Sequence, residues 1–341
     1  MIETPEIEPL PPSHVQRIFV GPDGIRAGWS IGIFVLAMSL VTLVLGFPLH
    51  YLFRPGVALP ASYAKMIQMG SGEFVGFIAI LLASMVMTRI ERRPLISYGL
   101  EGPHRIKRFF VGVFFGFAAL SVLVGALLAI GAYQFDGESA VGWEVVEFAV
   151  GWGLVFLFVG LFEEYMMRGY MQATLTRGIG FWWGAIILSL AFAGSHLANK
   201  GESPVGIFSA AAIAFIFCIS LWYLKNLWWA IGFHAAWDWG QTYFWGTPDS
   251  GLPAQGHLLA VHPLGTEAAD QGTVWSWRAL LSGGPTGPEG SLLIVPLLMI
   301  MVLAMWLTWR KRGVGIDGAT LVAAESAIVP DGPATPHEEL H

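Results

Sequence analysis

Long apolar segments separated by shorter polar ones dominate the chain. A helix that crosses a bilayer needs about 20 mostly apolar residues, and the segments that approach this length are 29–53, 67–88, 109–133, 143–162, 181–198, 205–224, 227–245 and 291–309. None of them alternates strictly between polar and apolar residues as a barrel strand does, and each can satisfy its own backbone hydrogen bonds as a helix. The pattern predicts an all-α polytopic membrane protein with about eight transmembrane helices.

The composition agrees with this prediction. Of the 341 residues, 55% are hydrophobic and 12% are charged, whereas soluble domains carry about a quarter charged residues. The net charge of −6 argues against nucleic acid as a partner, because nucleic acid requires a basic face. The single cysteine, Cys218, excludes an intrachain disulfide framework. The expected surroundings are therefore the lipid bilayer.

The segments outside the apolar stretches indicate the organisation and orientation of the chain. The start of the chain is acidic, so the first span is expected to be a retained anchor and not a cleaved signal. Placing both termini on the cytoplasmic side puts most of the Lys and Arg residues inside. We expect a cytoplasmic segment at 1–28, a membrane domain at 29–312 with an outer loop at 246–290, and a flexible cytoplasmic tail at 313–341. The protein would then be an integral, multi-pass component of the inner or cell membrane, if its source is bacterial.

Ionisable residues within the apolar stretches cluster in one third of the chain. Such a residue costs at least about 2.5–3.5 kcal/mol in hydrocarbon, so its presence indicates function. The clustered residues are Glu163, Glu164 and Arg168, then His196, and finally His234 and Asp238. Their convergence makes a purely structural origin the weaker interpretation.

Spacing predicts which of these residues share a helix face. Glu164 and Arg168 are four residues apart, so they are expected to form an ion pair whose role is structural. Glu163 is rotated about 100° from its neighbour, which leaves it free for another partner. His234 and Asp238 have the same four-residue spacing and should present an imidazole and a carboxyl group side by side.

Glu163 and His196 are expected to lie at the same depth in the membrane. If the turn between their helices centres near Ile179 and Gly180, the two residues are equally far from it along antiparallel helices. A water held between the carboxylate and the imidazole can then be deprotonated. With His234 on a following helix, these groups form a hydrolytic site.

The same residues resemble the CPBP family of intramembrane proteases, also called the CAAX protease and bacteriocin-processing or Abi family. The first motif, EExxxR, is matched by Glu163, Glu164 and Arg168, and the second, FxxxH, by Phe192 and His196. The third, a histidine followed four residues later by a small polar residue, is matched by His234 and Asp238. The resemblance covers a protease-like core at roughly 143–245. The CPBP family is related to the type II CAAX prenyl endopeptidases.

The resemblance implies an eight-helix membrane fold and hydrolysis of a peptide bond in a membrane-associated peptide or protein. By the family pattern, Glu163 and His196 activate the water, while His234 and the residue at 238 stabilise the oxyanion. The residues expected to support the structure of the site are Glu164, Arg168 and Phe192.

Asp238 departs from the prenyl endopeptidases, which carry asparagine at this position. An ionised carboxylate would repel an oxyanion, whereas a protonated one would donate a hydrogen bond to it. A zinc site is the alternative, because two histidines and two carboxylates suit this metal; its ligands would be Glu163, His196, His234 and Asp238. We favour the metal-free mechanism, with no cofactor.

One alternative function stays open, and two other interpretations are disfavoured. A non-catalytic membrane scaffold, or a bacteriocin-immunity-type binding protein on the same fold, is the alternative function, since motifs can persist for structure. A transporter is disfavoured, because the sequence shows no inverted repeat and its polar residues lie in one half. The residues from His337 to His341 match the HExxH zinc-protease pattern, but they follow Pro336 in the polar tail, where no stable helix is expected.

Overall fold

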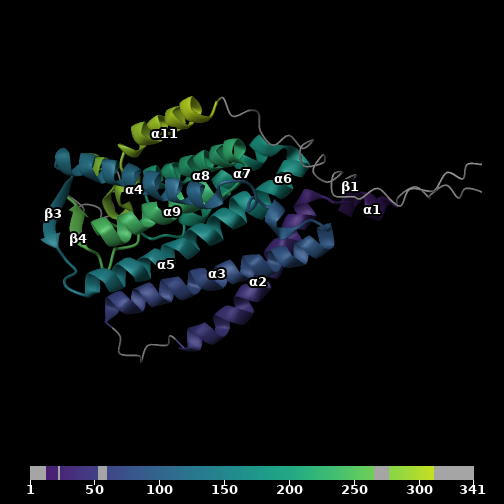
Figure 1. Ribbon diagram of the computed structural model, residues 1–341, viewed down its shortest axis with the longest axis horizontal. Helices are drawn as coiled ribbons and strands as arrows, with labels where there is room; N and C mark the ends of the chain where they lie inside the picture. The colour runs from purple at the N-terminus through teal and green to yellow at the C-terminus, as the bar shows by residue number, and fades with distance from the viewer. Residues whose placement is uncertain (1–12, 22–23, 53–59, 265–275, 311–341) are drawn as a thin grey trace, which may run out of the picture.

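The computed structural model describes residues 13–21, 24–52, 60–264 and 276–310 (Figure 1). The HExxH pattern at 337–341 and the predicted tail at 313–341 lie outside these residues. The longer helices run roughly alongside one another in Figure 1. They are α2 (Ala27–Leu52), α3 (Ala61–Glu91), α4 (Arg105–Ala129), α5 (Glu144–Glu164), α6 (Gln172–Ile179), α7 (Phe181–His196), α8 (Pro204–Leu224), α9 (Trp228–Trp239) and α11 (Ile294–Trp309).

The all-α membrane fold predicted from the sequence is confirmed. Among the described residues, five helical segments are long and apolar enough to cross a membrane. One of them runs without interruption from Glu144 to Ile179, because the π-helix η2 (Tyr165–Met171) joins α5 to α6. The helices α7 and α11 are apolar but shorter, and α9 continues as the π-helix η3 (Gly240–Trp245). Each of the predicted spans overlaps one of these helices, so the chain is an integral membrane protein.

The outward faces of the helices are apolar. On α2, the side chains of Leu43 and Val44 are 66% and 68% exposed, and Phe114 on α4 and Met299 on α11 are exposed to a similar extent. Apolar surface on this scale would be an aggregation liability in water. In a bilayer it contacts acyl chains, while the polar side chains of the site face the interior of the bundle.

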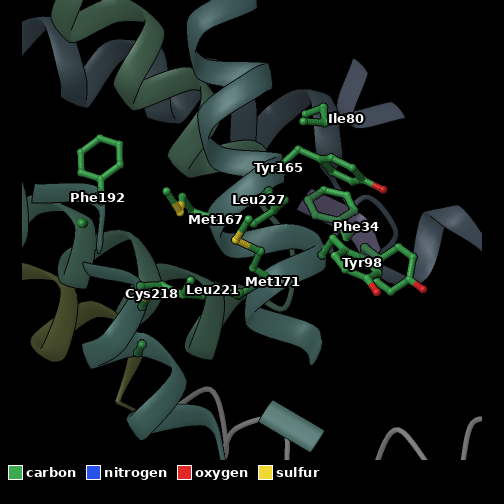
Figure 2. Close-up of a cluster of buried hydrophobic side chains, with 14 of the residues drawn as sticks. Phe34, Ile80, Tyr98, Tyr165, Met167, Met171, Phe192, Cys218, Leu221 and Leu227 are labelled. Carbon is green, nitrogen blue, oxygen red and sulfur yellow. The ribbon is translucent and has the colours of Figure 1, made fainter. Parts of the chain in front are cut away.

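A buried cluster of aromatic and sulfur-containing side chains joins α2, α3 and η2 (Figure 2). Phe34 stacks on Tyr170 with ring centroids 4.3 Å apart, and Tyr98 meets Tyr170 edge to face at 5.1 Å. The Tyr170 hydroxyl donates to Glu91 at 2.9 Å, and Arg177 pairs with the same carboxylate at 3.0 Å. These contacts fix the end of α3 against η2 and α6.

Helix α9 is held against α4 by direct backbone contact. A Cβ atom added to Gly112 would lie 2.1 Å from the Trp229 carbonyl oxygen, and one added to Gly116 would lie 2.2 Å from the Phe233 carbonyl oxygen. On α9, a Cβ atom at Gly232 would lie 2.1 Å from the Phe109 carbonyl oxygen. Small residues allow such close approach between membrane helices. The position of His234 and Asp238 therefore depends on α4.

The predicted turn between the helices that bear Glu163 and His196 is present. Helix α6 ends at Ile179, and Gly180 takes φ +86°, a conformation that favours glycine. Helix α8 then begins with Pro204 in its first turn, and the Ser203 hydroxyl accepts a hydrogen bond from the Gly206 amide at 3.1 Å. These signals determine where α7 and α8 begin.

Two strands that the sequence did not predict form an antiparallel pair. β3 (Tyr133–Glu138) follows α4, and β4 (Leu259–Pro263) lies within the segment predicted as the outer loop. Short elements complete this segment and the N-terminal part of the chain. They are α1 (His14–Phe19), β1 (Val20–Gly21), β2 (Gly24–Ile25), η1 (Leu95–Ser97), α10 (Trp277–Ser282), η5 (Gly284–Thr286) and η6 (Pro288–Gly290).

Candidate active site

A cavity of about 260 Å³ lies within the bundle, and the three motifs meet on its wall. The wall residues of each helix recur at helical spacing, so each helix contributes one face. On α5, for example, Trp152, Phe156, Val159 and Glu163 line the cavity, and on α7 Phe192 and His196 do so. Apart from Glu163, Asp238 and the two histidines, the α5, α7 and α9 part of the wall is aromatic and aliphatic.

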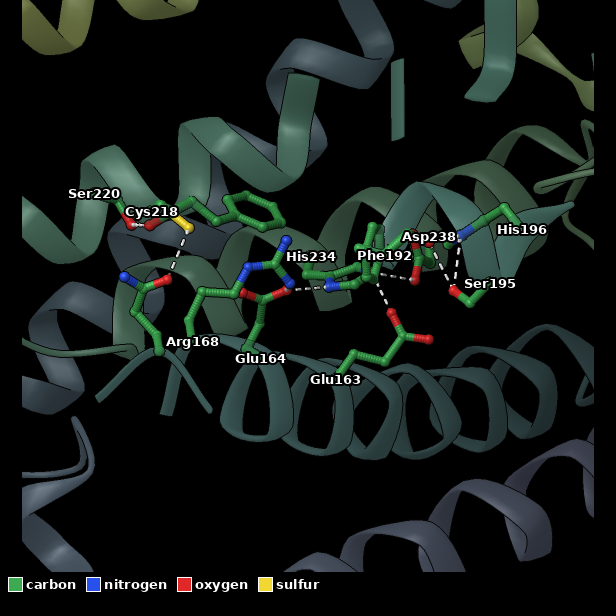
Figure 3. Close-up of polar contacts among 12 residues, drawn as sticks. Glu163, Glu164, Arg168, Phe192, Ser195, His196, Cys218, Ser220, His234 and Asp238 are labelled. Carbon is green, nitrogen blue, oxygen red and sulfur yellow. Dashed lines mark hydrogen bonds and ion pairs between the residues drawn. The ribbon is translucent and has the colours of Figure 1, made fainter. Parts of the chain in front are cut away.

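His234 is the centre of the polar contacts (Figure 3). Its Nδ1 atom lies 2.9 Å from Glu164 Oε1. Its Nε2 atom lies 3.6 Å from Glu163 Oε2 and 3.5 Å from Asp238 Oδ2. A single imidazole therefore contacts three carboxyl groups, of which the predicted four-residue pairing with Asp238 is one.

Glu164 binds two partners with the same oxygen. The predicted ion pair is present, because Arg168 Nη1 lies 3.0 Å from Glu164 Oε1 and both side chains are buried. The Arg168 guanidinium also lies over the Phe192 ring at 4.8 Å. Since the carboxylate accepts the Nδ1 hydrogen of His234, it fixes the ring so that Nε2 faces the cavity. Glu164 thus orients a histidine, a contact that helical spacing alone did not reveal.

Glu163 and His196 both line the cavity, but no direct contact joins them. Glu163 is partly exposed and has His234 as its nearest ionisable partner, at 3.6 Å. His196 Nδ1 lies 2.9 Å from the Phe192 carbonyl oxygen, and the two rings pack with centroids 4.7 Å apart. A carbonyl only accepts hydrogen bonds, so Nδ1 of His196 carries a hydrogen, and in the neutral ring the lone pair lies on Nε2. The space between the two residues belongs to the cavity.

The zinc alternative names four ligands, and all four line the cavity. Within the described part of the chain, no three or more His, Cys, Asp and Glu side chains are arranged to hold a metal ion. The Nδ1 atom of His234 is engaged by Glu164, and that of His196 by a backbone carbonyl. A metal would therefore have to bind these histidines through Nε2, and the Nε2 atom of His234 already contacts Glu163 and Asp238.

Four carboxyl groups of the wall were missed by the sequence analysis. Glu73 lies within α3, and Glu202, Asp249 and Glu289 come from the connections beyond α7 and α9. Burial, followed by the charge of Glu289, raises the pKa of Glu202 to about 7. Burial, followed by Asp238 and Glu289, raises the pKa of Asp249 well above its usual value. An ionisable residue inside an apolar span was the available signal for Glu73; the loop residues carry no such signal.

The connections that bring these loop carboxyls to the wall are tied together by hydrogen bonds. Asn199 Nδ2 donates to the Ser250 carbonyl oxygen at 2.9 Å, and the Ser250 amide and hydroxyl donate to Glu289 at 2.6 and 2.7 Å. The Thr286 hydroxyl donates to the Gly201 carbonyl oxygen at 3.0 Å. The segment predicted as an outer loop therefore forms one end of the cavity wall.

Comparison with known families identifies the segment that builds this site. Residues 145–240 match the family model described as type II CAAX prenyl endopeptidase Rce1-like. A comparison with curated proteins finds no match. The matched residues run from α5 to the first residue of η3 and include all three motifs, together with Glu164 and Phe192. The resemblance predicted from the sequence is thus confirmed over this segment, which is similar to the CAAX prenyl endopeptidases of the membrane.

Proposed function

We propose that the protein is an intramembrane endopeptidase that hydrolyses a peptide bond in a membrane-associated peptide or protein. The observation that supports this most strongly is the meeting of Glu163, His196, His234 and Asp238 on the wall of one cavity within the bundle. The similarity of residues 145–240 to a peptidase family points to the same reaction.

In the proposed reaction, Glu163 and His196 bind the attacking water from two sides. Glu163 takes a proton as the water oxygen bonds to the carbonyl carbon of the substrate. The carbon–nitrogen bond then breaks, and the same proton passes to the leaving amine. The free Nε2 lone pair of His196 suits it to hold the water in line with the carbonyl.

The carbonyl oxygen becomes an oxyanion, and we assign its stabilisation to His234 and Asp238. The Nε2 atom of His234 is the ring nitrogen that faces the cavity, so a protonated ring donates from there to the oxyanion. Asp238 can donate only as a neutral carboxylic acid, because an ionised carboxylate would repel the developing charge. Its contact with His234 at 3.5 Å supports this assignment.

The experiment that tests the function is proteolysis by purified protein reconstituted in lipid vesicles. The probes are a quenched-fluorescent farnesylated CAAX-type peptide and the same peptide without the lipid, and Glu163→Gln is the inactive control. Cleavage of either peptide by the wild type and not by the variant supports an endopeptidase. A mass-spectrometric comparison of cell membranes containing either protein extends the test to other substrates. Absence of any cleavage that depends on Glu163 in both experiments would favour the non-catalytic scaffold.

The same assay tests for a metal. Elemental analysis of the purified wild type and incubation with a chelator are run in parallel with the cleavage reactions. Unchanged activity after chelation, without bound zinc, supports the metal-free mechanism. Stoichiometric zinc and inactivation by chelator would instead refute the metal-free mechanism and support the zinc alternative.

A further inference from the structure

Glu73 is a carboxyl group of the cavity wall that the proposed mechanism does not use. It lies well inside α3, the longest of the described helices. Lys65 and Met69 precede it by eight and four residues, and all three line the cavity, so one face of α3 forms this part of the wall. An ionisable side chain at this depth is costly unless it has a function.

One oxygen of the Glu73 carboxyl group, Oε2, is buried without a hydrogen-bond partner among the described residues. Glu91, the other carboxylate of α3, shows the contrast, because it pairs with Arg177 and accepts from Tyr170. A buried polar atom without a partner in the protein indicates a ligand, a substrate group or a water that occupies the cavity.

The ionisable groups that interact with Glu73 lie on other helices of the same cavity wall. Glu163 on α5 and His234 on α9 interact with it electrostatically. On its own helix the cavity-facing cation is Lys65, two turns away, and on the neighbouring η2 Arg168 is paired with Glu164. Helix α2, which packs on another side of α3, contains no Asp, Glu, Lys or Arg between Ala27 and Leu52. Glu73 and Glu163 are therefore two carboxyl groups that face one cavity, and only Glu163 contacts a histidine.

We propose that Glu73 is a positioning residue of the protease: it holds a proton opposite Glu163 and donates it, as a hydrogen bond, to the water that Glu163 activates. This inference rests on the proposed function. Two carboxyl groups in a low-dielectric cavity do not readily ionise together, so they divide the roles of base and proton holder. Glu163, beside His234, is the base, and Glu73 keeps the proton and orients the water through it.

The proposal predicts different effects for two substitutions. Glu73→Gln keeps a neutral hydrogen-bond donor, so it should retain activity near the optimum and hold that activity at higher pH, where the native carboxyl group loses its proton. Glu73→Ala removes the donor and should lower kcat about tenfold with little change in KM. Glu138→Gln, which replaces an exposed carboxylate on β3, is the matched control and should behave as wild type.

Infrared spectroscopy supplies a readout that does not require proteolysis. At neutral pH, the carbonyl band of a protonated carboxylic acid should be weaker in Glu73→Gln than in the wild type and in Glu138→Gln. A band of equal strength in all three proteins, or superposable pH–rate profiles of wild type and Glu73→Gln, would overturn the proposal. Failure of Glu73→Gln to fold would also contradict it, because an amide replaces a neutral carboxyl group with little change in shape. If the wild type cleaves nothing, the proposed function fails, while the infrared result still decides the state of Glu73.

Discussion

Glu163 and Glu164 are neighbours in the chain, yet they belong to two different regions of the molecule. Glu164 lies in the closed interior, where Arg168 and His234 contact one of its oxygens and no solvent reaches it. Glu163 lies on the wall of the cavity, partly exposed, with one side of its carboxyl group open. Figure 3 shows the two groups diverging from the same turn of α5. Of two adjacent acidic residues, one can therefore be available for a reaction while the other stabilises the fold.

Replacing Glu163 should give the largest effect on activity. Glu163→Gln keeps the size of the side chain and removes the base, and loss of general-base catalysis costs about 10²–10⁴-fold in rate. The variant should fold normally, because Glu163 is not part of the buried pair. Initial rates in vesicles and thermal unfolding in detergent check the two statements. Full activity in the purified variant would refute the assignment of Glu163 as the base.

Replacing Glu164 or Arg168 should instead affect stability first. Glu164→Ala leaves the buried Arg168 guanidinium without its carboxylate, and Arg168→Ala leaves Glu164 with His234 alone. Breaking a buried pair in this way costs ~3–5 kcal/mol. Both should lower the Tm and the yield of folded protein far more than Glu163→Ala, which is the matched control next to them in the chain. Variants as stable as the wild type but inactive would show that the buried pair is needed for the reaction, through the hydrogen bond between Glu164 and His234.

Asp238 lies at the boundary between the two regions, and its replacement should lower activity less than the replacement of Glu163. Asp238→Asn should keep substantial activity, because an amide also donates a hydrogen bond to an oxyanion. Since the amide cannot ionise, activity should extend to higher pH than in the wild type. A pH–rate profile of both proteins tests this. Loss of most activity at every pH would mean that the carboxyl group acts as a base or a ligand.

Replacing Glu202 should have the smallest effect, a change in how stability depends on pH. The folded protein raises its pKa from 4.5 to about 7, so the stability that its protonated form contributes is complete below pH 4.5 and is lost as the pH rises through about 7. Glu202→Gln should therefore flatten the decline of Tm with pH across this window. The exposed Glu138→Gln should leave that decline unchanged, and an equal slope in all three proteins would contradict the burial argument.

The sequence predicted the parts of the structure that depend on local pattern. Apolar length gave the spans, and a turn near Ile179 and Gly180 was the starting point from which the equal depth of Glu163 and His196 was predicted. Four-residue spacing gave the Glu164–Arg168 pair. These features depend on one helix or one hairpin, so a period of 3.6 residues and a single glycine suffice to predict them.

Contacts between distant elements could not be predicted in this way. β3 and β4 pair across more than 100 residues of chain, and β4 lies in a segment rich in Gly and Pro. The bond from Glu164 to His234 joins two helices whose rotation about their own axes no spacing rule determines. Glu73 was overlooked because no second ionisable residue accompanies it in the middle of α3, although its cost in hydrocarbon was a valid signal.

The glycine contact between α4 and α9 has a consequence for the modularity of the protease-like segment. Gly112 and Gly116 lie outside residues 145–240, yet they determine how closely α9 approaches and hence where His234 and Asp238 lie. A shift of about 1 Å in such groups can cost about 10²-fold in rate. Residues 145–240 therefore cannot be transplanted into another helical scaffold with their function intact unless that scaffold offers α9 an equally bare, glycine-bearing surface.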